Sequence, residues 1–135
     1  MEMTSNIQYT GDLSTSCNHL KSRTSISTDA PLDNNGKGET FSPTDLVATA
    51  LASCMITVMG IKAEQDSIPF KQVSAHVLKV MSSGPRRISK IEVEVVVSEK
   101  WTEKQRVIME RTGLNCPVAK SLHQDLEQAI KFTYK

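Results

Sequence analysis

The stretch SPTDLVATALASCMITVMGIKAEQ, residues 42–65, is the most apolar part of this 135-residue chain. Its beginning is typical of a helix start. Ser42 suits the N-cap, Pro43 suits the first helical position because its missing N–H costs nothing there, and Asp45 favours the helix dipole. Since such a helix is apolar on nearly every side, the stretch predicts the central helix of a globular core. One cysteine, Cys54, lies in its middle.

The same stretch could in principle cross a membrane. Its apolar part runs 16 residues from Leu46 to Ile61, and Thr49, Ser53 and Thr57 interrupt it. At 1.5 Å per residue this part covers roughly 24 Å, which is short of the roughly 30 Å hydrocarbon core of a bilayer. We therefore expect a soluble protein and no membrane partner.

The rest of the chain predicts strands on both sides of this helix. Residues 9–29 predict strands with a turn at Gly11–Asp12, and residues 30–41 predict a loop rich in Gly, Asn and Pro. Residues 70–81 and 88–99 alternate apolar and polar side chains, so they predict an antiparallel hairpin.

Two helices and a strand are expected near the C-terminus. Thr102 is placed to cap a helix that Gly113 ends. Residues 115–128 predict a second helix, with Asn115 or Cys116 at its cap, and residues 129–134 predict a final strand. This order of elements predicts an α+β fold in one domain, residues 1–135.

Composition and charge exclude several classes of function. Sixteen Lys and Arg balance 15 Asp and Glu, and aromatic residues make up only 4% of the chain. We therefore expect no nucleic-acid partner, because both a basic surface and stacking side chains are lacking.

The N-terminus is polar, without the apolar region of a signal peptide. Three cysteines in such a chain indicate a reducing, cytoplasmic location.

Two cysteines differ in their expected surroundings. Cys116 lies at a predicted helix N-terminus, where the dipole and free N–H groups favour a thiolate. Cys54 lies within an apolar helix and needs a nearby cation or several donors to ionise. The two are 62 residues apart, so they form no local motif, but they could meet in space as an attacking and a resolving thiol. Two structural cysteines are the alternative.

Two motifs carry a family resemblance. FSPTDLVATALASC, residues 41–54, followed by CPVAKSL, residues 116–122, resembles the OsmC/Ohr family, and the likeness extends over about residues 6–134. The resemblance implies an α+β fold in which a long central helix packs against curved antiparallel sheets, in an intertwined homodimer.

The same resemblance implies a thiol peroxidase. It assigns Cys54 as the thiol that attacks an organic hydroperoxide and becomes a sulfenic acid. Cys116 is then the thiol that condenses with it to a disulfide. An external dithiol, such as a lipoylated protein, reduces that disulfide, and no bound cofactor is needed.

The chain departs from the family at the residues that stabilise the thiolate. Classical members of the family carry a Glu ten residues before the first cysteine, where this chain has Thr44, with Asp45 as the nearby acid. They also use an Arg from the N-terminal hairpin, and Arg23 is the one Arg before Cys54. Arg23, supplied by the same or the partner subunit, is our candidate cation. Asp45 is a candidate for holding it, or for capping the helix.

The remaining candidates have simpler interpretations. Cys17 matches no family cysteine and is interpreted as a packing residue. The histidines are interpreted as surface or core residues, and Cys116 with His123 lacks the common spacing of zinc ligands, so no metal site is expected. Against the peroxidase stands a non-catalytic, stress-associated dimer that binds a small molecule on the same fold.

Overall fold

The predicted central helix is present, with the predicted start. The structure is a computed structural model that describes residues 2–135, and in it the helix is α1 (Pro43–Asp66). The Ser42 N–H donates to Asp45 Oδ2 at 2.9 Å, and the Asp45 N–H donates to Ser42 Oγ at 3.0 Å. This reciprocal pair is a capping box, which satisfies two backbone donors at the start of the helix.

The observed length of α1 overturns one step of the membrane argument. The helix has 24 residues, about 36 Å at 1.5 Å per residue, so among the described residues it is long and apolar enough to span a bilayer. Length and composition of this kind are shared by core helices of soluble proteins. In this chain one face of α1 is buried in a hydrophobic core, through Ala48, Leu51, Ala52, Met55, Met59 and Ala63.

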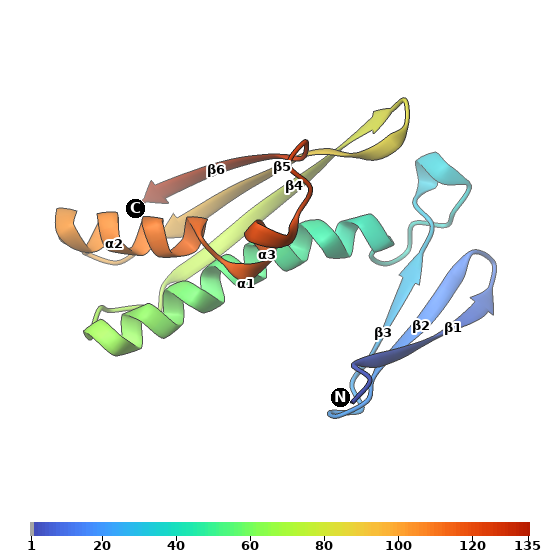
Figure 1. The fold of residues 1–135 in the computed structure, drawn as a ribbon, viewed down its shortest axis with the longest axis horizontal. Helices are drawn as coiled ribbons and strands as arrows, with labels where there is room; N and C mark the ends of the chain where they lie inside the picture. Colours follow the sequence, from blue (N-terminus) through green and yellow to red (C-terminus); the bar gives the residue numbers. More distant parts are fainter. Residues whose placement is uncertain (1) are drawn as a thin grey trace. The chain divides into compact units, whose positions relative to one another are not determined.

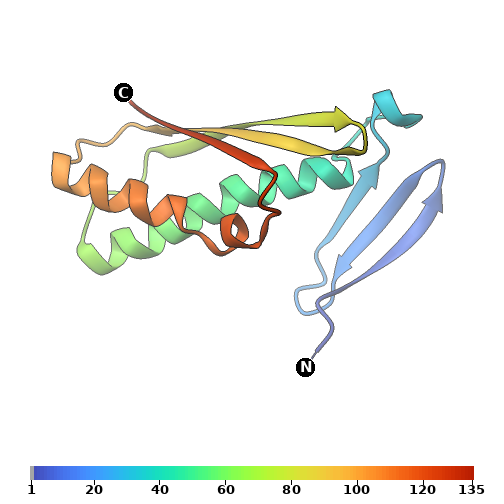
Figure 2. The ribbon, with the colours of Figure 1, turned by 45° about the horizontal axis from the view of Figure 1, so that its top comes forward.

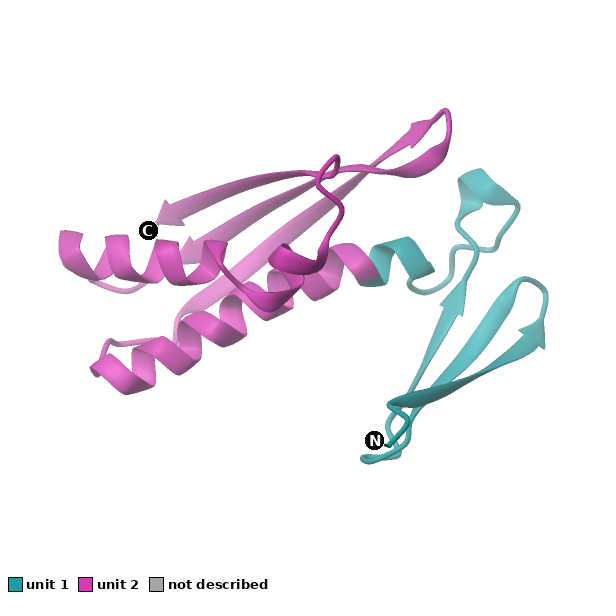
Figure 3. Cartoon of the chain, in the orientation of Figure 1, with its two compact units in different colours: residues 1–46 teal, residues 47–135 magenta. Residues whose placement is uncertain are grey.

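The chain forms two compact units, residues 1–46 and 47–135 (Figure 3). The first unit contains β1 (Ser5–Gly11), β2 (Ser14–His19) and β3 (Ser25–Asp29), which form an antiparallel sheet in that order. A short 3₁₀ helix, η1 (Leu32–Asn34), follows in the predicted loop. The β1–β2 turn is centred on Asp12 and Leu13, both with positive φ, one residue later than predicted.

The second unit contains most of α1 and the remaining elements. These are β4 (Val73–Ser83), β5 (Arg86–Val97), α2 (Glu103–Leu114), α3 (Pro117–Ser121) and β6 (Glu127–Tyr134). The sheet order is β4-β5-β6, and α1 and α2 lie side by side on one face of it (Figures 1 and 2). The predicted hairpin is confirmed as the antiparallel β4–β5 pair. β5 and β6 run parallel, so this sheet is mixed rather than purely antiparallel as expected.

The alternation in β5 explains how the sheet is covered. Its alternate residues Ile91, Val93, Val95 and Val97 are buried against the helices, whereas Glu92 and Glu94 lie on the other face. Parallel pairing with β6 extends this apolar face, because Val93 is opposite Ile130 and Val95 is opposite Phe132. The core of the second unit therefore lies between this sheet and the two helices.

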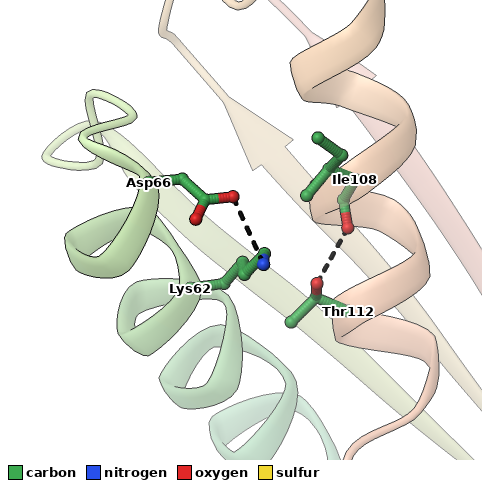
Figure 4. A network of polar contacts seen from close by, with 4 residues as sticks. All are labelled: Lys62, Asp66, Ile108 and Thr112. Carbon is green, nitrogen blue, oxygen red and sulfur yellow. Dashed lines mark hydrogen bonds and ion pairs between the residues drawn. The ribbon is translucent and has the colours of Figure 1, made fainter.

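Gly113 has a different role from the predicted one. It lies inside α2 and is buried, and the helix continues to Leu114 with Asn115 at its C-cap. A Cβ atom built at Gly113 would lie 2.9 Å from Met59 Sδ. The glycine therefore permits close packing of α2 on α1 instead of ending the helix. Figure 4 shows the two helices side by side, where the Lys62–Asp66 ion pair and the Thr112–Ile108 hydrogen bond each stay within one helix.

The helix predicted over residues 115–128 is much shorter than expected. α3 ends at Ser121 because Leu122 adopts an extended conformation, with φ −77° and ψ 153°. A turn follows, in which the Leu126 N–H donates to the His123 carbonyl at 3.0 Å. The turn buries the Leu126 side chain and starts β6 at Glu127, earlier than predicted. Residues 122–128, about two turns of the predicted helix, thus form an extended segment, a turn and the start of β6.

Candidate active site

Cys54 is held in the middle of α1 by the packing of its neighbours. Leu51, Ala52 and Met55 are buried in the core, and this fixes the rotation of the helix about its axis. Cys54 is on the edge of that buried face and is partly exposed. Cys54 therefore lies on a rigid helix, and its thiol is still accessible to a reagent in solution.

Cys116 is held at the N-cap of α3, which confirms one of the two predicted cap positions. Its backbone is extended, with φ −70° and ψ 154°, and Pro117 occupies the first helical position. The Ala119 N–H donates to Cys116 Sγ at 3.4 Å. The side chain is completely buried, so solvent does not reach this sulfur directly.

The side chains of Cys54 and Cys116 are neighbours and interact with each other. Burial raises the pKa of the Cys116 thiol, and the adjacent Cys54 side chain raises it further. The N–H groups of Ala119 and Val118 act in the opposite direction without cancelling this shift. Both cysteines are free. The arrangement is a reduced thiol pair in which Cys116 is kept protonated, and it brings together two residues far apart in the sequence.

The candidate thiolate-stabilising residues lie in the first unit, near turns and the helix start. Arg23 is exposed at the β2–β3 turn, with φ 63°, and its N–H donates to the His19 carbonyl at 2.7 Å. Asp45 forms the capping box with Ser42, so the capping alternative is confirmed. Thr44, at the position of the family Glu, has its hydroxyl 3.2 Å from that of Ser42.

Cys17 and His123 are the other residues that the sequence analysis considered. Cys17 lies on β2 between Ile7 and Ile26 of the adjacent strands, with Thr15 Oγ1 3.6 Å from its sulfur. Both isoleucines are exposed, so the packing role of Cys17 stays a prediction. His123 is exposed and accepts the Asp125 N–H at 3.0 Å. Within residues 2–135, no three His, Cys, Asp or Glu side chains gather as metal ligands would.

The backbone N–H groups around Cys116 were expected from its place at a helix N-terminus, but sequence reasoning missed the side chain of Gln128. Its amide donates to the Ala119 carbonyl at 3.0 Å. A signal for Gln128 exists in the sequence: its amide interrupts an otherwise apolar alternation with Ile130 and Phe132.

Comparisons with known proteins point to one family. A sequence model of a family described as OsmC-like protein matches residues 36–131, a range that includes parts of both units. A search of curated proteins found no match. A crystal structure from Psychrobacter arcticus is 48% identical, with a TM-score of 0.94 and coverage of 98% of this chain and 96% of that one. That protein is provisionally described as an osmotic stress induced and detoxification response protein.

More distant structures share the fold. An organic hydroperoxide resistance protein from Legionella pneumophila has a TM-score of 0.73 at 14% identity, over 97% of both chains. One from Elizabethkingia anophelis has a TM-score of 0.72 at 14% identity, over 100% of this chain and 99% of that one. At this identity the likeness concerns the fold alone.

Proposed function

Because the chain belongs to the OsmC-like protein family, we propose that it is a thiol peroxidase that reduces organic hydroperoxides. The observation that carries this proposal is the contact between the Cys54 and Cys116 thiols, two groups from separate elements of the second unit. A purely structural pair of cysteines needs no such contact. A peroxidatic and a resolving thiol do, because they must form a disulfide.

In the first step Cys54 is the attacking thiol. It is the accessible member of the pair, whereas Cys116 is completely buried. The Cys54 thiolate attacks one peroxide oxygen, the O–O bond breaks, and the departing alkoxide takes up a proton to leave as an alcohol. The sulfur is oxidised to sulfenic acid and the peroxide is reduced.

In the second step Cys116 resolves the sulfenic acid. Its sulfur attacks Cys54 Sγ and gives up its proton, and the sulfenic hydroxyl leaves as water. The N–H groups of Ala119 and Val118 stabilise negative charge that develops on the Cys116 sulfur during this attack. The raised pKa keeps Cys116 protonated until then, so that Cys54 alone meets the peroxide.

An external dithiol completes the cycle. It attacks the accessible sulfur, Cys54, and Cys116 leaves as the thiol, after which the second reductant thiol releases Cys54. A lipoyl-type dithiol fits this scheme, and so does a reducing cytoplasm. The apolar surroundings of Cys54 favour a hydroperoxide with an alkyl or aryl body over a small hydrated one.

The proposed active form is a homodimer. Along α1 the residues Val47, Ala50, Ser53, Thr57 and Ile61 form an exposed stripe at helical spacing. A second copy would cover this stripe, with an interface on the order of 2,000 Å² in total. Arg23 of either subunit is the proposed cation for the Cys54 thiolate, since a nearby positive charge favours the ionised form of a thiol that lies among apolar side chains.

One observation favours the alternative, a non-catalytic dimer that binds a small molecule. Thr44 takes the position of the family Glu, and its hydroxyl lies next to Ser42 at the helix start. A chain without this carboxylate could have lost the peroxidase step while keeping the fold.

Intact-protein mass spectrometry after one equivalent of cumene hydroperoxide tests the proposal. The expected product is a Cys54–Cys116 disulfide, 2 Da lighter than the reduced protein by loss of two hydrogens, and its formation consumes the peroxide. Cys54→Ser should abolish peroxide consumption, and Cys116→Ser should leave a trappable sulfenic acid. Cys17→Ser is the matched control and should behave as wild type. Absence of peroxide consumption by the wild type with a dithiol present would favour the non-catalytic alternative.

A further inference from the structure

Gln128 is a polar residue in an apolar row of β6. Alternate residues of a strand point to the same face, so Gln128 shares its face with Ile130 and Phe132, which pack against the core. A side-chain amide in such a position is costly unless it is hydrogen-bonded. Its Nε2 donates to the Ala119 carbonyl at 3.0 Å.

The Ala119 carbonyl needs a donor from outside α3. The helix has five residues and the chain is extended from Leu122, so the last carbonyls have no donor four residues later. Gln128 supplies that donor from the sheet. The N–H of the same residue, Ala119, donates to Cys116 Sγ at 3.4 Å. Ala119 is thus joined to the buried thiol on one side and to β6 on the other.

We propose that Gln128 is a positioning residue that holds Cys116 beside Cys54. Among the described residues, the hydrogen bond of Gln128 joins α3 to the sheet beside chain connectivity and apolar contacts, so without it the Cys116 sulfur spends less time next to Cys54. The role in disulfide formation rests on the proposed peroxidase function, whereas the holding of Cys116 can be measured in the reduced protein.

The first experiment removes the donor and keeps the volume. Gln128→Leu preserves apolar packing on the inner face of β6. Thr133→Val is the matched control, since it removes another β6 hydrogen bond, to Glu94 on the opposite face. After a pulse of cumene hydroperoxide, the rate of conversion of Cys54 sulfenic acid to disulfide is followed by dimedone trapping and mass spectrometry. We expect it to fall about fivefold in Gln128→Leu, the factor that follows from losing one hydrogen bond, and to stay unchanged in Thr133→Val.

The second experiment uses pH. In Gln128→Glu the introduced carboxyl can donate to the Ala119 carbonyl when it is protonated and repels that carbonyl when it is ionised. The ratio of the disulfide-forming rate of this variant to that of the wild type should therefore rise as pH is lowered. If Gln128→Glu only disturbed packing, the ratio of the two disulfide-forming rates would be the same at every pH.

Alkylation of the reduced protein separates the two proposals. Iodoacetamide labelling of Cys116, measured on its peptide by mass spectrometry, should be about fivefold faster in Gln128→Leu than in Thr133→Val. Equal labelling rates in these two variants would overturn the positioning role, and so would an unchanged rate of disulfide formation. If the wild type forms no disulfide at all, the peroxidase function is overturned, and the labelling rates decide the role of Gln128.

Discussion

Replacement of Gly113 by alanine tests how closely α1 and α2 pack next to the thiol pair. The added Cβ would lie 2.9 Å from Met59 Sδ, 3.3 Å from Met59 Cγ and 3.7 Å from Phe132 Cζ. Met59 has no exposed surface, so its side chain cannot move out into solvent to make room. Overpacking of this kind costs roughly 1–3 kcal/mol, against a gain of about 1 kcal/mol from the better helix propensity of alanine. We expect a net loss of about 1 kcal/mol in the free energy of unfolding.

Denaturant unfolding and thermal melting measure this loss, which corresponds to a fall of about 3 °C in Tm for a chain of this size. Gly60→Ala is the matched control, because it adds the same methyl group inside α1 at a looser contact, 3.3 Å from Phe70 Cε2. It should be neutral or stabilising. A double-mutant cycle with Met59→Ala should show coupling, since the Gly113→Ala methyl fills part of the resulting cavity. A Gly113→Ala variant as stable as the wild type would refute the argument from close packing.

Three other predictions concern the thiols and the exposed stripe of α1. Arg23→Ala should slow iodoacetamide labelling of Cys54 at neutral pH about tenfold, while Lys21→Ala leaves it unchanged; an equal rate in both variants would exclude Arg23 as the activating cation. Because burial raises the pKa of the Cys116 thiol, the unfolded chain ionises first, so the free energy of unfolding should fall as pH rises above the ordinary thiol pKa, and Cys116→Ala should flatten that fall in urea titrations. Ile61→Glu should turn a dimer into a monomer in sedimentation velocity at micromolar concentration, and a monomeric wild type would contradict the proposed interface.

Local signals in the sequence were enough to place most elements. Ser42 and Asp45 predicted the start of α1, and the structure shows them as a capping box. Thr102 predicted the start of α2, where it forms a second capping box with Gln105. Alternation predicted the β4–β5 hairpin and its buried face. These signals act within about four residues or along one strand, so no tertiary contact is needed to recognise them.

Other local signals were overridden by packing. Gly113 has the sequence signature of a helix end, but it lies inside α2, at a point where Met59 is too close for a side chain. The helical pattern after Pro117 ends at Ser121, because burial of Leu126 and parallel pairing of β6 with β5 outweigh further helical turns. In both places the energy of a contact with a distant element exceeds a local preference of about 1 kcal/mol or less per residue.

The features of the candidate site also divide into those that local sequence signals predict and those that packing decides. The sequence by itself identified Cys54 on the central helix, and it identified Cys116 at a helix N-cap next to Pro117. Only the tertiary structure decided that these thiols are neighbours, that burial raises the pKa of the Cys116 thiol, and that Gln128 donates a hydrogen bond to its helix. The physical reason is that contact between residues 62 positions apart depends on how α1, α3 and β6 pack around one core, and that packing is the sum of many long-range contacts which no short motif contains.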